Sequence, residues 1–249
     1  MNPNNFNSEQ WNTSGVSASE TSVKVFMSRV FGWMFGALVI TAFTAYAFAT
    51  VPALSEMLYV YRDGRIIGFQ ALATILMIAP FLLVLAISIG FNRFSFPALA
   101  GLFILFSVLF GASLSTIFLR YSMPTIGASF AIAAGMFGTM AVMGFTTKAD
   151  LSKFGAIMFM GLFGIIIASV VNFFMHSETM GYLISFAGVA VFTGLTAYDV
   201  QKLKNIGAGI TYGSQSAAKL SIMGALSLYL DFINLFLFVL RLMGGGNRR

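Results

Sequence analysis

Asp231 lies in the middle of the apolar stretch from Leu220 to Leu242, which is long enough to cross a lipid bilayer. An ionisable side chain at that depth is costly, so it usually faces the protein interior and serves an ion path, a proton relay or a switch. A second aspartate, Asp199, closes the preceding apolar stretch. These two carboxyl groups predict a site that exchanges protons or meets cations inside the membrane.

Small and polar residues accompany Asp231 on one face of its predicted helix. At helical steps of three, four, three and seven residues, this face holds Gly224, Ser227, Asp231, Asn234 and Arg241. A polar face in hydrocarbon must turn inward, toward partner groups or a watery crevice. A structural hydrogen-bond network is the alternative interpretation for Asp231, and pairing with Lys202 near a helix end is the alternative for Asp199.

The two carboxyl groups should lie in the same half of the membrane. The sixth predicted helix, which carries Asp199, runs toward the loop with Lys202 and Lys204, and the seventh, which carries Asp231, starts from that side. Contact between them needs some stagger or tilt, since we expect Asp199 near its helix end and Asp231 roughly 16 Å in from Lys219. If they meet, they cannot both ionise cheaply, so one of them keeps its proton.

Composition decides the class of protein. Of the 249 residues, 58% are hydrophobic and only 9% are charged, and the mean hydropathy is +0.89. In a water-soluble domain, about a quarter of the residues are charged. Because backbone groups in lipid must be paired internally and the apolar runs do not alternate, the sequence predicts an all-α, polytopic bundle. The absence of cysteine excludes thiol chemistry and disulfides.

Apolar runs of about 20 residues predict seven transmembrane helices joined by short connections. Their ranges are 25–49, 67–90, 96–119, 126–145, 154–175, 180–198 and 220–242. The sequence therefore divides into a disordered polar tail at 1–23, a transmembrane domain at 24–244 and a basic C-terminal tail at 245–249. Small residues at helical spacing predict close packing, in the sets Ser107, Gly111 and Ser115; Gly127, Ala131 and Gly135; and Gly161, Gly164, Ala168 and Asn172.

The net charge of +6 comes from basic residues in loops and at helix ends, which favours anionic lipid over nucleic acid as a partner. With a cytoplasmic N-terminus, the cytoplasmic side carries eight basic residues and the other side six. The bias predicts that the N-terminus is cytoplasmic and the C-terminus lies across the membrane.

Three stretches of the sequence identify a family. LSLYLDFINLFLFVLR from Leu226, LTAYDVQKLKNIG around Asp199 and KADLSKFG before the fifth helix resemble the transmembrane Bax inhibitor motif proteins, in particular the bacterial members. The resemblance covers all seven predicted helices, from about Val23 to Gly244. It implies six helices around a central seventh, in the bacterial inner membrane.

The resemblance also implies a function, a calcium-permeable leak whose opening follows pH. The motif positions of the pH sensor are Asp199 and Asp231, which would bind calcium weakly and transiently, and Arg93 occupies the region of an arginine latch. Supporting polar roles fall to Ser227, Asn234 and Asn172. We therefore expect calcium as a permeating ion, no cofactor and no enzymatic activity, with acid favouring opening.

Other functions remain open. A regulator that binds other membrane proteins, in stress, cell death or membrane-protease control, would need no transport. A proton-coupled carrier would also use a protonatable pair, although the two halves of the chain show no convincing inverted repeat. An aspartyl protease is disfavoured because Leu228 to Leu230 stand where such enzymes place glycines before the second aspartate. The lone histidine, His176, makes no metal cluster.

Overall fold

The computed structural model describes residues 8–62, 65–210 and 214–245. Within these ranges the elements in chain order are α1 (Ser8–Thr50), α2 (Pro52–Ser55), β1 (Tyr59–Arg62), β2 (Arg65–Phe69), α3 (Ala71–Gly90), α4 (Phe96–Leu114), α5 (Thr116–Arg120), α6 (Met123–Thr146), α7 (Ser152–Met175), α8 (Glu178–Ala208) and α9 (Gln215–Gly245). In this part of the chain, seven segments are long and apolar enough to span a membrane, α4 and α5 counting as one. The predicted all-α, seven-helix class is confirmed.

Helix α1 is longer than the sequence led us to expect. It begins at Ser8, so residues 8–23 are helical where we predicted a disordered tail. The physical reason is that nucleation is the costly step of helix formation, and a polar segment joined to an existing helix extends it turn by turn. Residues 1–7 of the predicted tail and residues 246–249 of the C-terminal tail lie outside the described residues.

A β-hairpin separates the first two spans and corrects the predicted start of the second. Strands β1 and β2 pair antiparallel, with Tyr59 opposite Phe69. The predicted second span began at residue 67, but α3 begins only at Ala71. β-branched residues favour an extended backbone, and the sequence places Asp63 and Gly64, a typical hairpin-turn pair, between the strands.

Capping residues set several of the helix ends. Ser122 caps α6 by accepting a hydrogen bond from the backbone N–H of Thr125, and Ser177 caps α8 by accepting from Met180 over 3.2 Å. His176 ends α7 in the left-handed region at φ 51°. The tight turn between α7 and α8 brings these two helices together as neighbours.

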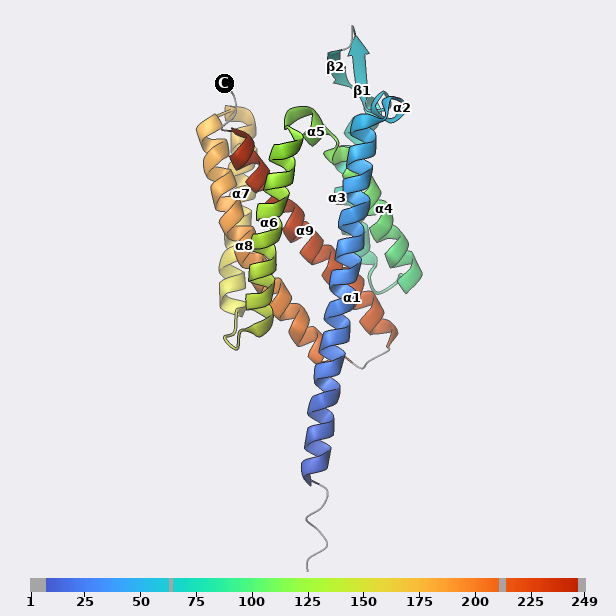
Figure 1. Ribbon diagram of the computed structural model, residues 1–249, viewed down its shortest axis with the longest axis vertical. Coiled ribbons are helices and arrows are strands. Elements are labelled where there is room, and N and C mark those ends of the chain that lie inside the picture. Colours follow the sequence, from blue (N-terminus) through green and yellow to red (C-terminus); the bar gives the residue numbers. More distant parts are fainter. Residues whose placement is uncertain (1–7, 63–64, 211–213, 246–249) are drawn as a thin grey trace, which may run out of the picture.

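The helices form two groups with α9 between them (Figure 1). In one group α4 packs against both α1 and α3, and in the other α8 packs against both α6 and α7. α9 crosses the bundle diagonally and contacts α8, α1, α6 and α4. Of the most apolar window of α9, 67% is buried, against 11% for α7. This confirms that the seventh span is central.

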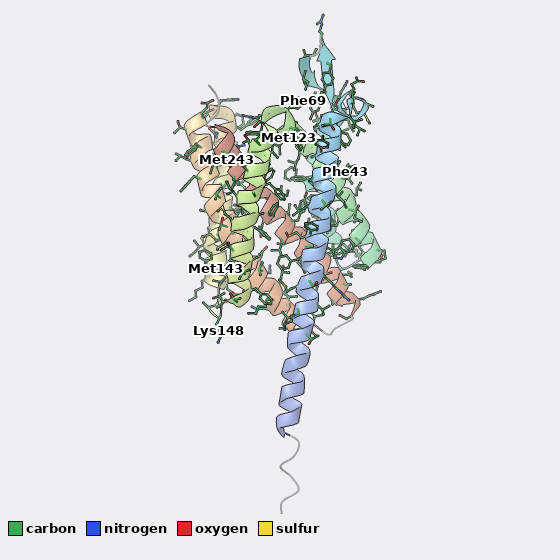
Figure 2. All side chains as sticks on the ribbon, in the orientation of Figure 1. Phe43, Phe69, Met123, Met143, Lys148 and Met243 are labelled. Atoms are coloured by element: carbon green, nitrogen blue, oxygen red, sulfur yellow. The ribbon has the colours of Figure 1, made fainter. Side chains whose placement is uncertain are left out.

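The chain crosses the bundle alternately, so the start of α1 and the end of α9 lie at opposite ends (Figure 1). The loop between α6 and α7, marked by Lys148 in Figure 2, lies at the same end of the bundle as the start of α1. Within the described residues, this end gathers the basic side chains predicted to be cytoplasmic, which are Lys24, Arg29, Arg93, Lys148, Lys153, Lys202, Lys204 and Lys219. The cytoplasmic side itself stays a prediction.

The small residues divide into true contacts and lipid-facing positions. A side chain on Gly111 would lie 2.6 Å from the carbonyl oxygen of Thr41, so α4 approaches the backbone of α1 closely. By contrast, Gly127 and Gly135 have no atom within 4 Å of that position, and Ala131 is exposed. The predicted packing face is therefore correct for α4 and wrong for α6. Helical spacing identifies a small-residue face but not its partner.

Candidate functional site

Asp199 and Asp231 meet between α8 and α9. Their carboxyl groups lie within reach of a shared hydrogen bond, and each residue is only 6% exposed. Helix α8 continues nine residues beyond Asp199 to Ala208, which corrects our expectation that this aspartate lies near a helix end. Asp231 lies at the middle of α9. The longer α8 carries Asp199 inward and allows the contact.

The two carboxyl groups have different surroundings. Asp199 accepts a hydrogen bond from the hydroxyl of Ser227 at its Oδ2 atom, and the charge of Lys202 acts on it. Oδ2 of Asp231 is buried and receives no hydrogen bond from the part of the chain that the structure describes. Two carboxyl groups can bond to each other only through a proton. The geometry therefore favours the negative charge on Asp199 and the shared proton on Asp231.

The pair is enclosed by the apolar interior of the bundle. Val200, next to Asp199, is wholly buried, as are Leu228 and Tyr229 on the turn of α9 before Asp231. Such surroundings strengthen every electrostatic interaction of the pair and make a second charge expensive. Chemically, the pair can hold or release one proton and can offer carboxylate oxygens to a cation.

The structure does not bring Arg93 to the aspartates. Its exposed side chain lies in the turn between α3 and α4, where its backbone N–H bonds to Gly90 over 2.9 Å. α3 and α4 pack with α1, on the other side of α9 from most of α8. The cation that acts on Asp199 is Lys202. Among the described residues the structure shows no contact between Arg93 and the aspartates, and Lys202 acts on Asp199 through its charge without forming an ion pair with it.

Of the three supporting polar residues, only Ser227 reaches the pair. Asn234 donates to the carbonyl of Leu230 over 2.8 Å within its own helix. Asn172 accepts from the backbone of Ser177 over 3.1 Å, at the turn between α7 and α8. That turn is at the opposite end of α8 from Asp199, so Asn172 stabilises a helix connection and not the site.

A second polar centre, which the sequence analysis missed, lies on the other face of α9. The hydroxyl groups of Tyr229 and Thr41 are 2.7 Å apart, and Thr41 donates to the carbonyl of Ser107 over 3.0 Å. Three helices, α9, α1 and α4, thus meet through hydroxyl groups. Tyr229 lies two residues from Asp231, but a tyrosine within an apolar run is indistinguishable from core filling.

Helix α8 is also fixed on the side that faces α6. The side-chain amide of Gln201 accepts from the backbone of Leu151 over 2.8 Å and donates to Ala149 over 2.7 Å. Lys204 donates to the carbonyl of Phe145 at the end of α6, over 2.7 Å. A cation at a helix C-terminus is favourable. These contacts hold the loop between α6 and α7 against α8, within two turns of Asp199.

Together, the fold and the buried pair define a multi-pass helical membrane protein with a protonatable site at its central helix. The chain belongs to the family described as "Inhibitor of apoptosis-promoting Bax1", whose profile matches residues 23–248. The predicted resemblance to the transmembrane Bax inhibitor motif proteins is therefore confirmed.

Bacterial relatives match almost the whole chain. An inner membrane protein of Escherichia coli strain K12, YbhL, is 46% identical over 228 residues, which cover 91% of this chain and 93% of the relative. An uncharacterized protein of Borreliella burgdorferi is 41% identical, over 88% of this chain and 91% of the relative. One of Caulobacter vibrioides is 35% identical, over 91% and 90%. The chain is a multi-pass protein of the bacterial inner membrane, as expected.

Proposed function

We propose that this protein is a pH-sensitive, calcium-permeable leak, a transporter and not an enzyme, and that the carboxyl pair is its sensor. One observation carries the proposal: the carboxyl groups of Asp199 and Asp231 meet inside the bundle, between two membrane-spanning helices, and both residues are buried. A protonatable pair at this depth is rarely without a functional role.

Protonation of Asp199 would loosen the contact between α8 and α9. As a carboxylate, Asp199 holds the Ser227 hydroxyl through a charge-assisted hydrogen bond and attracts Lys202. Charge-assisted bonds are roughly twice as strong as neutral ones. A second proton removes this charge, so acid weakens the contacts that join the two helices. Acidification therefore favours opening, and Ser227 and Lys202 take the part first expected of Arg93.

Calcium fits the site as a passing ion. Calcium prefers six to eight oxygen ligands, whereas this pair supplies the oxygens of two carboxyl groups. Binding is therefore weak and transient, and a permeating ion must be able to leave its site. Membrane lipid is the second expected partner, in contact with the basic end of the bundle.

The test is calcium flux through the purified protein in liposomes, at about pH 6 and about pH 8. We expect greater flux in acid, and loss of the difference in Asp199→Asn and Asp231→Asn. Asp150→Asn removes a carboxylate from an exposed loop and serves as the matched control, with an unchanged pH response. Arg93→Gln should also keep the response. Flux that is independent of pH, or unchanged by both aspartate substitutions, would refute the proposal.

A further inference from the structure

The second polar centre fixes α9 from the side opposite the carboxyl pair. Tyr229 and Asp231 are two residues apart, which turns their side chains about 200° around the helix axis at 3.6 residues per turn. Accordingly, Asp231 bonds to α8 and Tyr229 bonds to α1. The central helix is hydrogen-bonded to both halves of the bundle within a single turn.

Counting protons shows which hydroxyl group is the donor in the hydrogen bond between Tyr229 and Thr41. A hydroxyl group has one proton to donate. Because Thr41 donates its proton to the carbonyl of Ser107, the proton between Thr41 and Tyr229 comes from the tyrosine. Tyr229 is 0% exposed, and its ring makes edge contacts with Phe103, Phe106 and Phe110. Replacing Tyr229 by phenylalanine therefore removes one donor and leaves the donor of Thr41 satisfied.

The surroundings of Tyr229 are neutral. Among the described residues, its ring and hydroxyl contacts come from α1 and α4 and involve hydroxyl groups, a backbone carbonyl and phenylalanine rings, with no charged side chain. This centre does not titrate in the range in which carboxyl groups do. It is a fixed point from which the position of α9 is set.

Both partners of α9 at this level are themselves firmly held. On one side, α1 is held by α4, where Gly111 allows the backbone of Thr41 to approach. On the other side, a side chain on Gly144 of α6 would lie 2.2 Å from the carbonyl oxygen of Ala197, two residues before Asp199. The hydrogen bonds of Gln201 and Lys204 strengthen this contact between α6 and α8. The carboxyl contact therefore depends on where α9 lies between these two fixed neighbours.

We propose that the Tyr229 hydroxyl is a positioning group for the carboxyl pair: by bonding α9 to Thr41 it sets the depth and rotation at which Asp231 meets Asp199, and with it the pH at which the leak opens. This rests on the proposed function for its effect on flux, whereas the effect on helix position stands independently. Tyr229 touches neither the ion nor the carboxyl groups in this role.

The first test compares Tyr229→Phe with a matched variant in the same flux assay. Tyr59 is also a buried tyrosine with a hydroxyl bond of 2.7 Å, to Ser115, but it lies in the hairpin. Tyr229→Phe should raise the pH of half-maximal flux by about half a unit, the order of one lost hydrogen bond. Tyr59→Phe should leave it unchanged. Thr41→Val, which removes the partner hydroxyl, should shift it in the same direction and takes the place of Tyr229→Phe if that variant does not fold.

The second test reports helix position without flux. The natural chain has no cysteine, so Leu203→Cys and Gly224→Cys introduce a single pair where α8 and α9 approach, a side chain on Gly224 lying 2.6 Å from Leu203. At one fixed pH, adding Tyr229→Phe should change the rate of disulfide formation at least about threefold, the order of one hydrogen bond, and adding Tyr59→Phe should not.

The outcomes separate the two proposals. If the wild-type protein passes no calcium but Tyr229→Phe alters the cross-linking rate, the proposed function fails and the positioning role stands. If Tyr229→Phe and Thr41→Val behave like Tyr59→Phe in cross-linking and in pH profile, the positioning role is refuted, whatever the leak does. A lower melting temperature alone, with both readouts unchanged, also refutes it, because it reports only lost stability.

Discussion

The two polar centres on α9 have similar burial and opposite chemistry. The carboxyl centre, Asp231 with Asp199, links α9 to α8 through groups that gain and lose a proton as the pH changes. The hydroxyl centre, Tyr229 with Thr41, links α9 to α1 through a hydrogen bond that keeps its proton over the same pH range. Each lies beside a glycine that lets two backbones touch, Gly144 for the first and Gly111 for the second. The difference is that only one of these attachments depends on pH.

This asymmetry explains how a tightly packed bundle can respond to protons. A core packed on all sides is bistable and does not deform continuously. A permanent attachment on one face of α9 and a titratable one on the other confine the response to the interface between α8 and α9. The predictions that follow test this division, beginning with the largest effect.

Removing one carboxyl group should cost more than removing both. Asp199→Leu leaves Asp231 buried without its partner, and we expect a loss of about 3 kcal/mol in the free energy of unfolding. The double variant Asp199→Leu and Asp231→Leu should recover most of it, since no polar group is then left unpaired. Unfolding in detergent micelles measures both. Losses that simply add would show that the two carboxyl groups do not depend on each other.

Replacing the close-packed glycine near each centre by alanine should destabilise the protein by about the same amount. A methyl group on Gly144 would meet the carbonyl oxygen of Ala197 at 2.2 Å, and one on Gly111 would meet that of Thr41 at 2.6 Å. Because backbone atoms cannot move aside cheaply, each alanine variant should lose about 2 kcal/mol of stability. Gly135→Ala, with open space around it, is the matched control and should be neutral or slightly stabilising. A neutral Gly144→Ala would mean that α6 and α8 are not in close contact.

The pH dependence of coupling should distinguish the centres. In a double-mutant cycle, Thr41→Val and Tyr229→Phe should couple by about 1 kcal/mol, equally at about pH 6 and about pH 8. The coupling between Asp199→Asn and Ser227→Ala should fall in acid, because the hydroxyl then bonds to a neutral acid. If the coupling energies of the two cycles changed with pH in the same way, the two centres would not differ in their dependence on pH.

The seven spans and the aspartate pair could be predicted because lipid leaves few choices. Long apolar runs must form helices, and a buried carboxyl group must find a partner. The hairpin was missed because Ile67 and Phe69 were counted toward the next span on hydropathy, although Asp63 and Gly64 signalled a turn.

Contacts between distant helices could not be predicted in the same way. The bond from Tyr229 to Thr41 joins residues 188 positions apart, and a single sequence carries no record of such pairings. The distance of Arg93 from the aspartates could not be predicted for the same reason: its place between two spans was correct, but packing decides which helices face each other across α9. Likewise, the spacing that predicted packing faces on α4 and α6 could not tell a helix partner from lipid.

Asp150 provides the smallest effect and a reference carboxyl group in water. It precedes α7 and accepts a hydrogen bond from the backbone of Ser152 over 2.9 Å. Bonds from the Ser152 side chain and backbone lower the pKa of Asp150 below its ordinary value. A lowered pKa stabilises the fold above the ordinary pKa, and that contribution is lost as the pH falls through the lower, folded value.

Asp150→Ala should therefore reduce the melting temperature slightly at about pH 7, and the difference from wild type should vanish well below the ordinary aspartate pKa of about 3.9. Its flux should keep the wild-type response to pH, because the exposed carboxylate touches neither α8 nor α9. If Asp150→Ala altered that response, the sensor would extend into the loop between α6 and α7. The Gln201 and Lys204 contacts would then transmit charge changes from water to Asp199, and the titratable attachment of α9 would no longer be confined to one interface.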